Sequence, residues 1–194
     1  MPERLKTITI FPYQPHWPEE FRRMGTELRQ HLGQLALRID HIGSTSVPGL
    51  AAKDIIDIQV TVRALSPVVG QVLVSMDCLR KEHISHDHLP PGETDAGRWQ
   101  KWIFQPPAAW RPAHIHVRIS DLPNQRYPLL FRDYLRTHPL AAQAYAQVKT
   151  ALARLRPQDV DAYYDVKDPV CDIIIAGAES WAAASGWQPG PTDI

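Results

Sequence analysis

The chain has 194 residues, of which 44% are hydrophobic and 22% are charged, a composition typical of a folded globular protein. This length fits one domain, or one domain with a helical extension, and needs neither a disulfide nor a metal to complete a core. The 21 lysine and arginine residues balance 21 aspartate and glutamate residues. That balance argues against nucleic acid or an acidic membrane as a partner attracted by overall charge, but it allows a local basic pocket.

The cysteines and the hydropathy pattern exclude further classes of protein. Cys78 and Cys171 lie far apart with no CxxC spacing, which excludes a cysteine-based zinc site and predicts two reduced thiols. No apolar run approaches the ~18–20 residues of a transmembrane helix, and the N-terminal sequence MPERLKTITIF lacks a signal-peptide core. We therefore expect a cytoplasmic protein with neither a membrane nor nucleic acid as a partner.

The first part of the chain alternates strand and helix patterns. Alternating β-branched residues predict a short strand over 7–11, and apolar residues at helical spacing predict a helix over 19–33. Strands are expected over 35–42 and 54–62, the second with its isoleucines on one face and polar residues on the other. A serine followed by a proline, a favoured helix start, predicts a further helix over 66–76.

The second part begins with strands and ends with helices. We expect a strand over 79–85, a polar loop over 86–97, and an antiparallel strand pair over 98–105 and 113–120. Helical patterns broken at His-Pro and Arg-Pro steps predict three helices over 126–137, 139–155 and 158–181.

This order of elements predicts an α+β fold with a mixed β-sheet, helices on one face of the sheet, and a C-terminal helical extension. We expect the α+β core to span residues 1–122, a helical layer packed on it to span 123–185, and a flexible tail to follow at 186–194. Together these parts form one compact domain. Neither GxGxxG nor GxxxxGK[ST] occurs, so the sequence supports neither a dinucleotide fold nor a P-loop.

The segment 41–60, HIGSTSVPGLAAKDIIDIQV, holds the densest group of candidate site residues. A predicted strand ends there in a turn made of Gly43, Ser44, Thr45 and Ser46. Backbone N–H groups and hydroxyls gathered in such a turn suit a phosphate or another anion, and glycine permits close approach. Asp57 follows on the next strand, where its carboxylate is placed to hold a hard cation against that anion.

The same segment strongly resembles the hallmark of the GrpB family, a group similar to nucleotidyltransferases of the DNA polymerase beta superfamily. Four other segments resemble GrpB sequences in the expected order: FPYQPHWPEEF, HIHV, FRDYLRTHPLAAQAYAQVK and AYYDVK. The resemblance covers about residues 10–168. It implies a nucleotidyltransferase-like α+β core with a helical extension.

The resemblance also implies a chemistry. In active members of the superfamily, a Gly-Ser turn holds the nucleotide triphosphate, and an Asp-x-Asp or Asp-x-Glu pair with a third carboxylate binds two divalent metal ions. Carried across, Gly43 and Ser44 match the turn and Asp57 matches the first carboxylate. Gln59 stands in place of the second carboxylate, and the strand expected to carry the third reads AHIHVR. Asp57 and Ser44 are therefore the catalytic candidates, whereas Gln59 offers a metal only a neutral oxygen.

Two histidines stand on the strand that is expected to carry the third carboxylate. His114 and His116 alternate with apolar residues, so both imidazoles point to one side of a strand. If that side also carries Asp57, the predicted metal ligands are Asp57, Gln59, His114 and His116, with His41 nearby. The resemblance implies Mg²⁺ or Mn²⁺, whereas a mixed histidine and carboxylate set also suits Zn²⁺, Fe²⁺ or Ni²⁺.

Basic and aromatic side chains complete the predicted site. Arginine offers a planar fork and lysine a point charge to a phosphate or carboxylate. The ligand-binding candidates of this kind are Lys53, Arg98, Lys101, Arg132, Tyr163 and Lys167.

Three functions remain open at this point. The first is an enzyme that binds a nucleotide or another phosphorylated or acidic small molecule with a divalent metal, nucleotidyl transfer being its default chemistry by analogy of fold. The second is a catalytically degenerate module that senses a nucleotide or assists coenzyme A metabolism, because GrpB-like segments also occur fused to dephospho-CoA kinase. The third is a metal-dependent lyase, hydrolase or ligase acting on an acidic metabolite.

Overall fold

A five-stranded mixed sheet forms the centre of the molecule. The computed structural model describes residues 7–194, so the first six residues of the predicted core lie outside the described part. The strand order is β1-β2-β5-β4-β3, and only β2 and β5 run parallel. The strands are β1 Arg38–Ile42, β2 Ile56–Val62, β3 Leu79–Arg80, β4 Lys101–Gln105 and β5 Ala113–Ile119. The expected α+β fold with a mixed sheet is confirmed.

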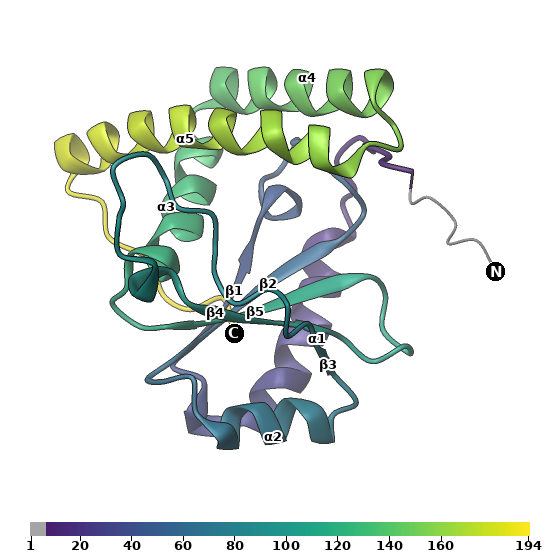
Figure 1. Ribbon diagram of the computed structural model, residues 1–194, viewed down its shortest axis with the longest axis vertical. Coiled ribbons are helices and arrows are strands. Elements are labelled where there is room, and N and C mark those ends of the chain that lie inside the picture. The colour runs from purple at the N-terminus through teal and green to yellow at the C-terminus, as the bar shows by residue number, and fades with distance from the viewer. Residues whose placement is uncertain (1–6) are drawn as a thin grey trace.

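Two helices, α1 (Trp17–Leu32) and α2 (Pro67–Ser75), cover one face of the sheet (Figure 1). Alternation along β2 turns Ile56 and Ile58 toward them, and both residues are fully buried. Helix α1 presents a matching apolar stripe that includes the buried Phe21. Each such side chain contributes roughly 1.5–3 kcal/mol when fully buried. This face therefore holds the main hydrophobic core.

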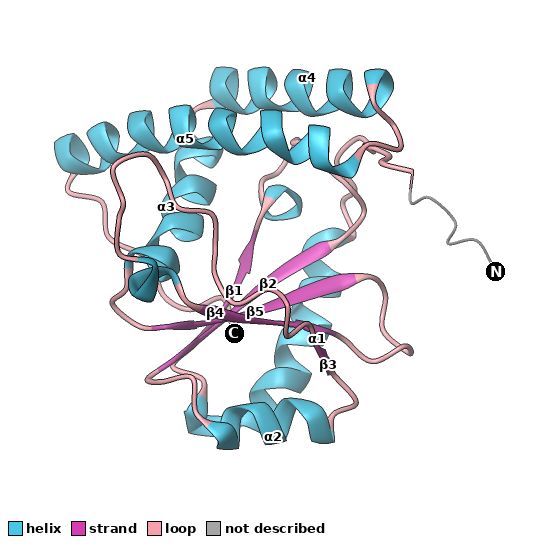
Figure 2. Cartoon of the chain, in the orientation of Figure 1, coloured by secondary structure: helices cyan, strands magenta, loops and turns pink. Residues whose placement is uncertain are grey.

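The C-terminal extension lies on the other side of the sheet (Figure 2). It consists of α3 (Pro123–Thr137), α4 (Pro139–Leu155) and α5 (Val160–Ser185). Proline stands at the start of α3 and α4, where its missing N–H is not needed for the helical hydrogen bonds. Figure 1 shows α4 and α5 side by side above the sheet, joined to it through α3. The helical extension predicted from the sequence is thus present. One small apolar cluster joins α3 to α5, and another packs α3 and α4 against Val47 and Leu50.

Some predicted strands are shorter in the structure. The segment 7–11 makes only a single β-bridge between Phe11 and Ala52, because the prolines that follow it cannot donate to a ladder. The strand expected over 79–85 ends after Arg80, where the chain turns back and Ile84 donates to the Lys81 carbonyl. The loop that follows crosses toward the helical extension and contributes to the site described below.

The C-terminal segment 186–194 is docked on the sheet, and the expectation of a flexible tail is corrected. It follows the free edge of β1, where the Ile194 N–H donates to the Ile39 carbonyl at 3.2 Å. The Thr192 hydroxyl accepts from the Ile39 N–H and the Asp193 carboxylate accepts from the His41 N–H, both at 2.9 Å. An edge strand presents unpaired backbone groups, and the tail satisfies those of β1.

Within residues 7–194, no helix combines the length and the apolar character that crossing a membrane requires.

Candidate functional site

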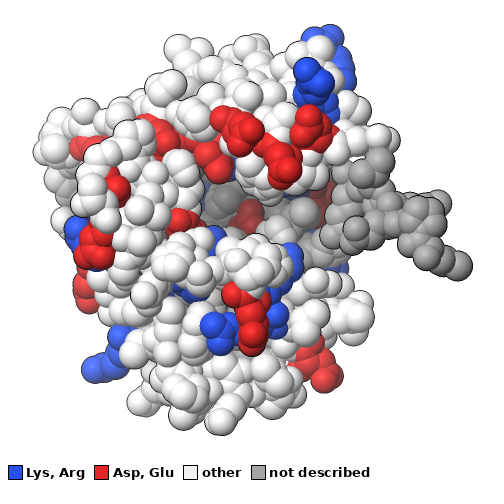
Figure 3. Space-filling view, viewed as in Figure 1, with Lys and Arg blue, Asp and Glu red and all other residues white. Residues whose placement is uncertain are grey.

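A cavity of about 520 Å³ opens between the polar face of the sheet and the helical extension. Figure 3 shows the hollow on the surface, below a row of acidic side chains on α5. Ten of the residues predicted from the sequence line this cavity: Gly43, Ser44, Thr45, Lys53, Asp57, Lys101, His114, His116, Tyr163 and Lys167. Residues far apart in the sequence thus share one space.

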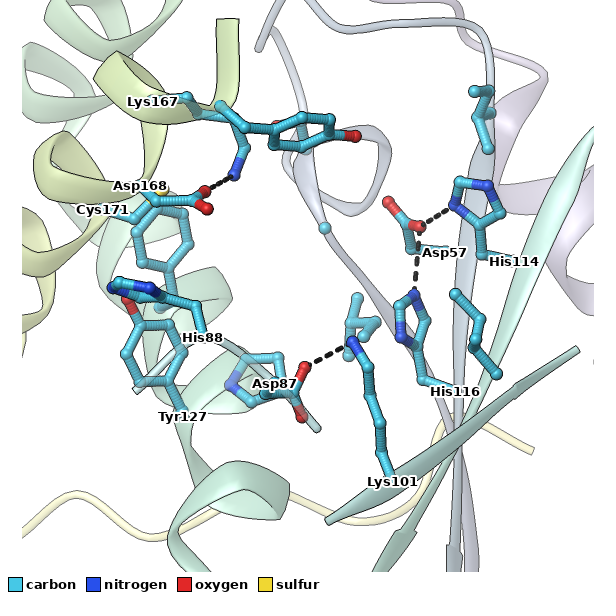
Figure 4. Close-up of a pocket in the computed structure, with 18 of the residues that line it drawn as sticks. Asp57, Asp87, His88, Lys101, His114, His116, Tyr127, Lys167, Asp168 and Cys171 are labelled. Carbon is cyan, nitrogen blue, oxygen red and sulfur yellow. Dashed lines mark hydrogen bonds and ion pairs between the residues drawn. The ribbon is translucent and has the colours of Figure 1, made fainter. Parts of the chain in front are cut away.

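Asp57 lies between the two histidines of β5 (Figure 4). The parallel pairing of β2 with β5 places Asp57 opposite His114 and turns His116 to the same face. Asp57 Oδ1 lies 3.2 Å from His114 Nδ1 and 3.4 Å from His116 Nε2. All three donor atoms lie within 4.8 Å of one another, and no other group of at least three such residues within 7–194 is this compact. One carboxylate and two imidazoles at this spacing fit a single divalent ion.

The protonation states of this group also suit a metal. Burial alone would raise the pKa of the Asp57 carboxyl group, but hydrogen bonds with His114 and His116 outweigh it and hold that pKa below the ordinary range. Burial lowers the pKa of His116 to about 4, against the opposing effect of Asp57. At neutral pH Asp57 is therefore ionised and His116 is neutral, which are the forms that bind metals.

Gly43 allows the turn after β1 to pass directly against Asp57. Its φ of 71° and ψ of −174° belong to a region that is open almost only to glycine. A Cβ at this position would lie 3.0 Å from both Cβ and Cγ of Asp57 and still closer to Oδ2. Both the backbone conformation and the space therefore require glycine here.

We predict that Gly43→Ala moves Asp57 away from the histidines, so that Mn²⁺ affinity falls at least ~10-fold and the free energy of unfolding falls by about 1–3 kcal/mol. Calorimetric titration with Mn²⁺ and thermal denaturation measure the two effects. Gly49→Ala is the matched control, since Gly49 also has a positive φ of 80° but an added Cβ would meet nothing within 4 Å. Equal losses of metal affinity in both variants would contradict the steric role of Gly43.

Ser44 of the turn has a lysine partner that is not among the residues predicted from the sequence. Lys149 of α4 donates to Ser44 Oγ at 2.8 Å and to the Ala51 carbonyl at 2.6 Å. It lies four residues after the buried Tyr145, so it shares the inward face of the helix with that tyrosine. A lysine at an apolar helical position was the signal in the sequence that could have identified it.

The other basic residues of the cavity differ in how their charge is balanced. Lys167 pairs with Asp168 at 2.7 Å. Lys53 donates to the Tyr164 hydroxyl at 3.1 Å and lies 5.2 Å from the centre of the Tyr163 ring. Its partners there are neutral, so a bound anion could use its charge.

Asp87 is a further site residue, and no pattern in the sequence indicates it. It comes from the loop after β3 and accepts from Arg118 Nε and Nη2, both at 2.8 Å, and from Lys101 Nζ at 2.7 Å. Burial would raise the pKa of Asp87, but the Arg118 guanidinium and then Lys101 hold it well below the ordinary carboxyl range. The charge of the predicted ligand residue Lys101 is therefore already paired.

Two predicted metal ligands are engaged elsewhere. Gln59 shares the face of Asp57, but its Oε1 accepts from Arg118 Nη1 at 2.8 Å and its amide donates to the Gln125 carbonyl at 3.0 Å. His41 lies on the opposite face, stacked on Phe21 with ring centres 4.7 Å apart. The expectation that Gln59 and His41 complete the metal site is thus corrected.

Three predicted ligand-binding residues do not line the cavity. Arg98 is exposed on the surface, 4.0 Å from the Glu93 carboxylate. Arg132 is buried and donates to the His41 carbonyl at 3.0 Å, so it anchors β1. Ser46 donates to the Gly43 carbonyl at 2.6 Å and shapes the turn from behind. Their assignment to ligand binding is corrected to structural or surface roles.

Comparisons with known proteins agree with this architecture. The sequence profile of the GrpB protein family matches residues 7–176. A UPF0157 protein of Halalkalibacterium halodurans is 33% identical, over 90% of this chain and 84% of its own length. A dephospho-CoA kinase of Mycolicibacterium paratuberculosis is 34% identical over 94% of this chain, which spans only 48% of that longer protein.

A solved structure resembles the fold as a whole. The crystal structure of the conserved protein GrpB from Enterococcus faecalis superimposes with a TM-score of 0.69 at 31% identity, covering 89% of this chain and 99% of that one. The likeness therefore extends over sheet and helical extension alike. On the profile match and these relatives, the chain belongs to the GrpB protein family.

Proposed function

We propose that this protein binds a phosphorylated small molecule, with a nucleotide as first candidate, together with one divalent metal ion held by Asp57, His114 and His116. The observation that carries the proposal is that this donor group and the turn with Ser44 open into the same cavity. A cation there would act as a Lewis acid on a phosphoryl oxygen. Ser44 and Lys53 would hold the phosphate.

The surroundings of the donor group favour one metal ion rather than two. Gln59 stands where the nucleotidyltransferase superfamily has its second carboxylate, and its Oε1 already accepts a hydrogen bond from Arg118 Nη1. Asp87 supplies a carboxylate nearby, but Arg118 and Lys101 neutralise it. Two-metal nucleotidyl transfer needs further anionic ligands that these contacts take up. Transfer in this protein would therefore rely on one metal ion and the basic side chains of the cavity.

The same contacts favour a second candidate, a nucleotide-sensing or accessory module that binds without turnover. The match to one part of a longer dephospho-CoA kinase adds to this view, since it links such a domain to coenzyme A metabolism. Both candidates predict metal-dependent nucleotide binding. They differ in whether pyrophosphate is released.

The test uses the purified chain with each nucleoside triphosphate and Mg²⁺, Mn²⁺ or Zn²⁺. We expect calorimetry to show nucleotide binding that strengthens with one of these metals and weakens at least ~10-fold in His116→Gln. His86→Gln is the control, because His86 lies outside the cavity. Pyrophosphate release identifies transfer, and tight binding without release identifies the sensing module. Absence of binding to every nucleotide, with and without metal, would refute the proposal.

A further inference from the structure

Lys149 is an unusual residue for the interior of a helical layer. Lys149 is only 2% exposed, and its amine reaches the cavity wall beside the turn after β1. There Nζ contacts Ser44 Oγ and the Ala51 carbonyl, and it lies 4.5 Å from the centre of the Tyr145 ring. All three partners are neutral.

No carboxylate of residues 7–194 lies within the 4.0 Å of an ion pair with this amine. A buried ammonium group without a counter-ion is costly. Burial accordingly lowers the pKa of Lys149 to about 7.

The titratable groups that face Lys149 come from three sides. On α5, Cys171 opposes the lowering of the Lys149 pKa, whereas Lys167 adds to it. Lys53, from the loop before β2, also lowers the pKa, and Asp57 of β2 raises it. The phenols of Tyr145 and Tyr163 stay neutral because burial raises their pKa values. None of these groups supplies Lys149 with a paired negative charge.

The cavity as a whole carries more positive than negative charge. Six lysine and arginine residues line it against three aspartates. Two of the aspartates are already paired with cations, as are Lys101, Arg118 and Lys167. Lys53 and Lys149 have only neutral hydrogen-bonding partners. Lys53 and Lys149 therefore leave two positive charges available to a ligand that carries at least two negative charges.

We propose that Lys149 recognises the terminal phosphate of the ligand, and that binding of this phosphate is coupled to uptake of a proton by the Lys149 amine. This inference rests on the proposed function and extends it to a ligand class, the phosphate monoesters and polyphosphates. A phosphate group can carry a second negative charge near neutral pH, because its second pKa is about 6. A single carboxylate brings one charge only. The proton comes from the solvent and converts the amine to the ammonium form that pairs with the phosphate.

The experiment uses inorganic tripolyphosphate as the probe, without metal, in calorimetric titrations at pH 7. Titrations in two buffers with different ionisation enthalpies give the number of protons taken up on binding. The probe can exchange protons of its own in both proteins, so the quantity that reports on Lys149 is the difference from Lys149→Met. We expect the unmodified chain to take up about half a proton more than that variant, since Lys149 is about half protonated at pH 7. Lys149→Met is also expected to weaken binding at least ~10-fold, as loss of a charged hydrogen bond does.

Two further variants make the result specific. Arg154→Met removes a cation from the exposed part of the same helix and should leave affinity and proton uptake unchanged. Lys149→Arg keeps a permanent positive charge, so it should restore binding without this additional proton uptake. Thermal denaturation shows whether each variant is folded. If Lys149→Met does not fold, binding and proton uptake by Lys149→Arg test the role of Lys149 instead.

The outcomes separate this inference from the proposed function. Unchanged affinity and proton uptake in Lys149→Met overturn the role of Lys149, while binding by the unmodified chain still supports the phosphate site. Binding by the unmodified chain with no more proton uptake than Lys149→Met overturns the coupling. Failure of the unmodified chain to bind tripolyphosphate overturns the inference, and it overturns the proposed function as well if nucleotides with metal also fail to bind.

Discussion

Asp87→Asn is expected to lower the free energy of unfolding by about 3 kcal/mol, the low end of the range for breaking a buried ion pair. The carboxylate holds two cations that have almost no access to water, since Arg118 is 5% and Lys101 8% exposed. An amide of the same shape removes the charge and leaves both cations uncompensated. Urea denaturation at pH 7 measures the difference in the free energy of unfolding between Asp87→Asn and the unmodified chain.

The pH dependence of this effect follows from the direction of the pKa shift. The pKa of Asp87 is lower in the folded protein than in the unfolded chain, so its contribution is complete above the unfolded value of about 4. It disappears as the pH falls below 4 toward the folded pKa. The stability difference between the two proteins should shrink over that interval.

A matched control lies in the same loop. Glu93 is 4.0 Å from the exposed Arg98, and such a surface pair contributes at most about 1 kcal/mol. Its carboxylate also accepts from Trp99 Nε1 at 3.1 Å, a bond that the oxygen of a glutamine can keep. Glu93→Gln should therefore change stability little. A loss below about 1 kcal/mol in Asp87→Asn would show that Asp87 does not anchor the loop to the sheet.

Asp57→Asn is expected to weaken the binding of Mn²⁺ or Zn²⁺ at least ~100-fold while leaving the fold intact. The asparagine oxygen can still accept from His114, but the site loses its one negative charge. Changes to groups that only orient metal ligands already cost 10–100-fold in affinity, so a direct ligand should cost at least the upper value. Calorimetric titration with the metal alone measures the loss.

Asp165→Asn is the control for this variant, because Asp165 is an exposed carboxylate on α5. It should bind metal like the unmodified chain, and both variants should denature cooperatively. Metal affinity that is the same in Asp57→Asn and in the control would exclude Asp57 as a ligand.

The sequence predicted those parts of the fold and site that depend on local pattern. Alternation along β5 placed His114 and His116 on one face, and the glycine turn was identified by its composition. The prediction that His41 is a metal ligand is wrong because strand alternation does not reveal the register between strands. In the structure Ile42 pairs with Asp57 and His41 with Ile58, and a shift of one residue exchanges the two faces.

Contacts between segments that are distant in the sequence are harder to predict, because no local pattern of residues indicates them. Gln59 was assigned to the correct face, but only the neighbouring strand reveals that Arg118 holds its oxygen. Asp87 lies in a polar loop whose path across the cavity has no periodic pattern. The tail at 186–194 has the composition of a frayed end, and it is ordered because the edge of β1 offers it unpaired backbone groups.

Anomalous diffraction from a crystal of this protein soaked in Mn²⁺ tests the metal site at Asp57, His114 and His116 most directly. We expect one anomalous peak within about 2.0–2.3 Å of Asp57 Oδ1, His114 Nδ1 and His116 Nε2, the distance range of metal bonds to such ligands. No peak at this position, or a pair of peaks that includes an ion bound by Gln59, would contradict this site.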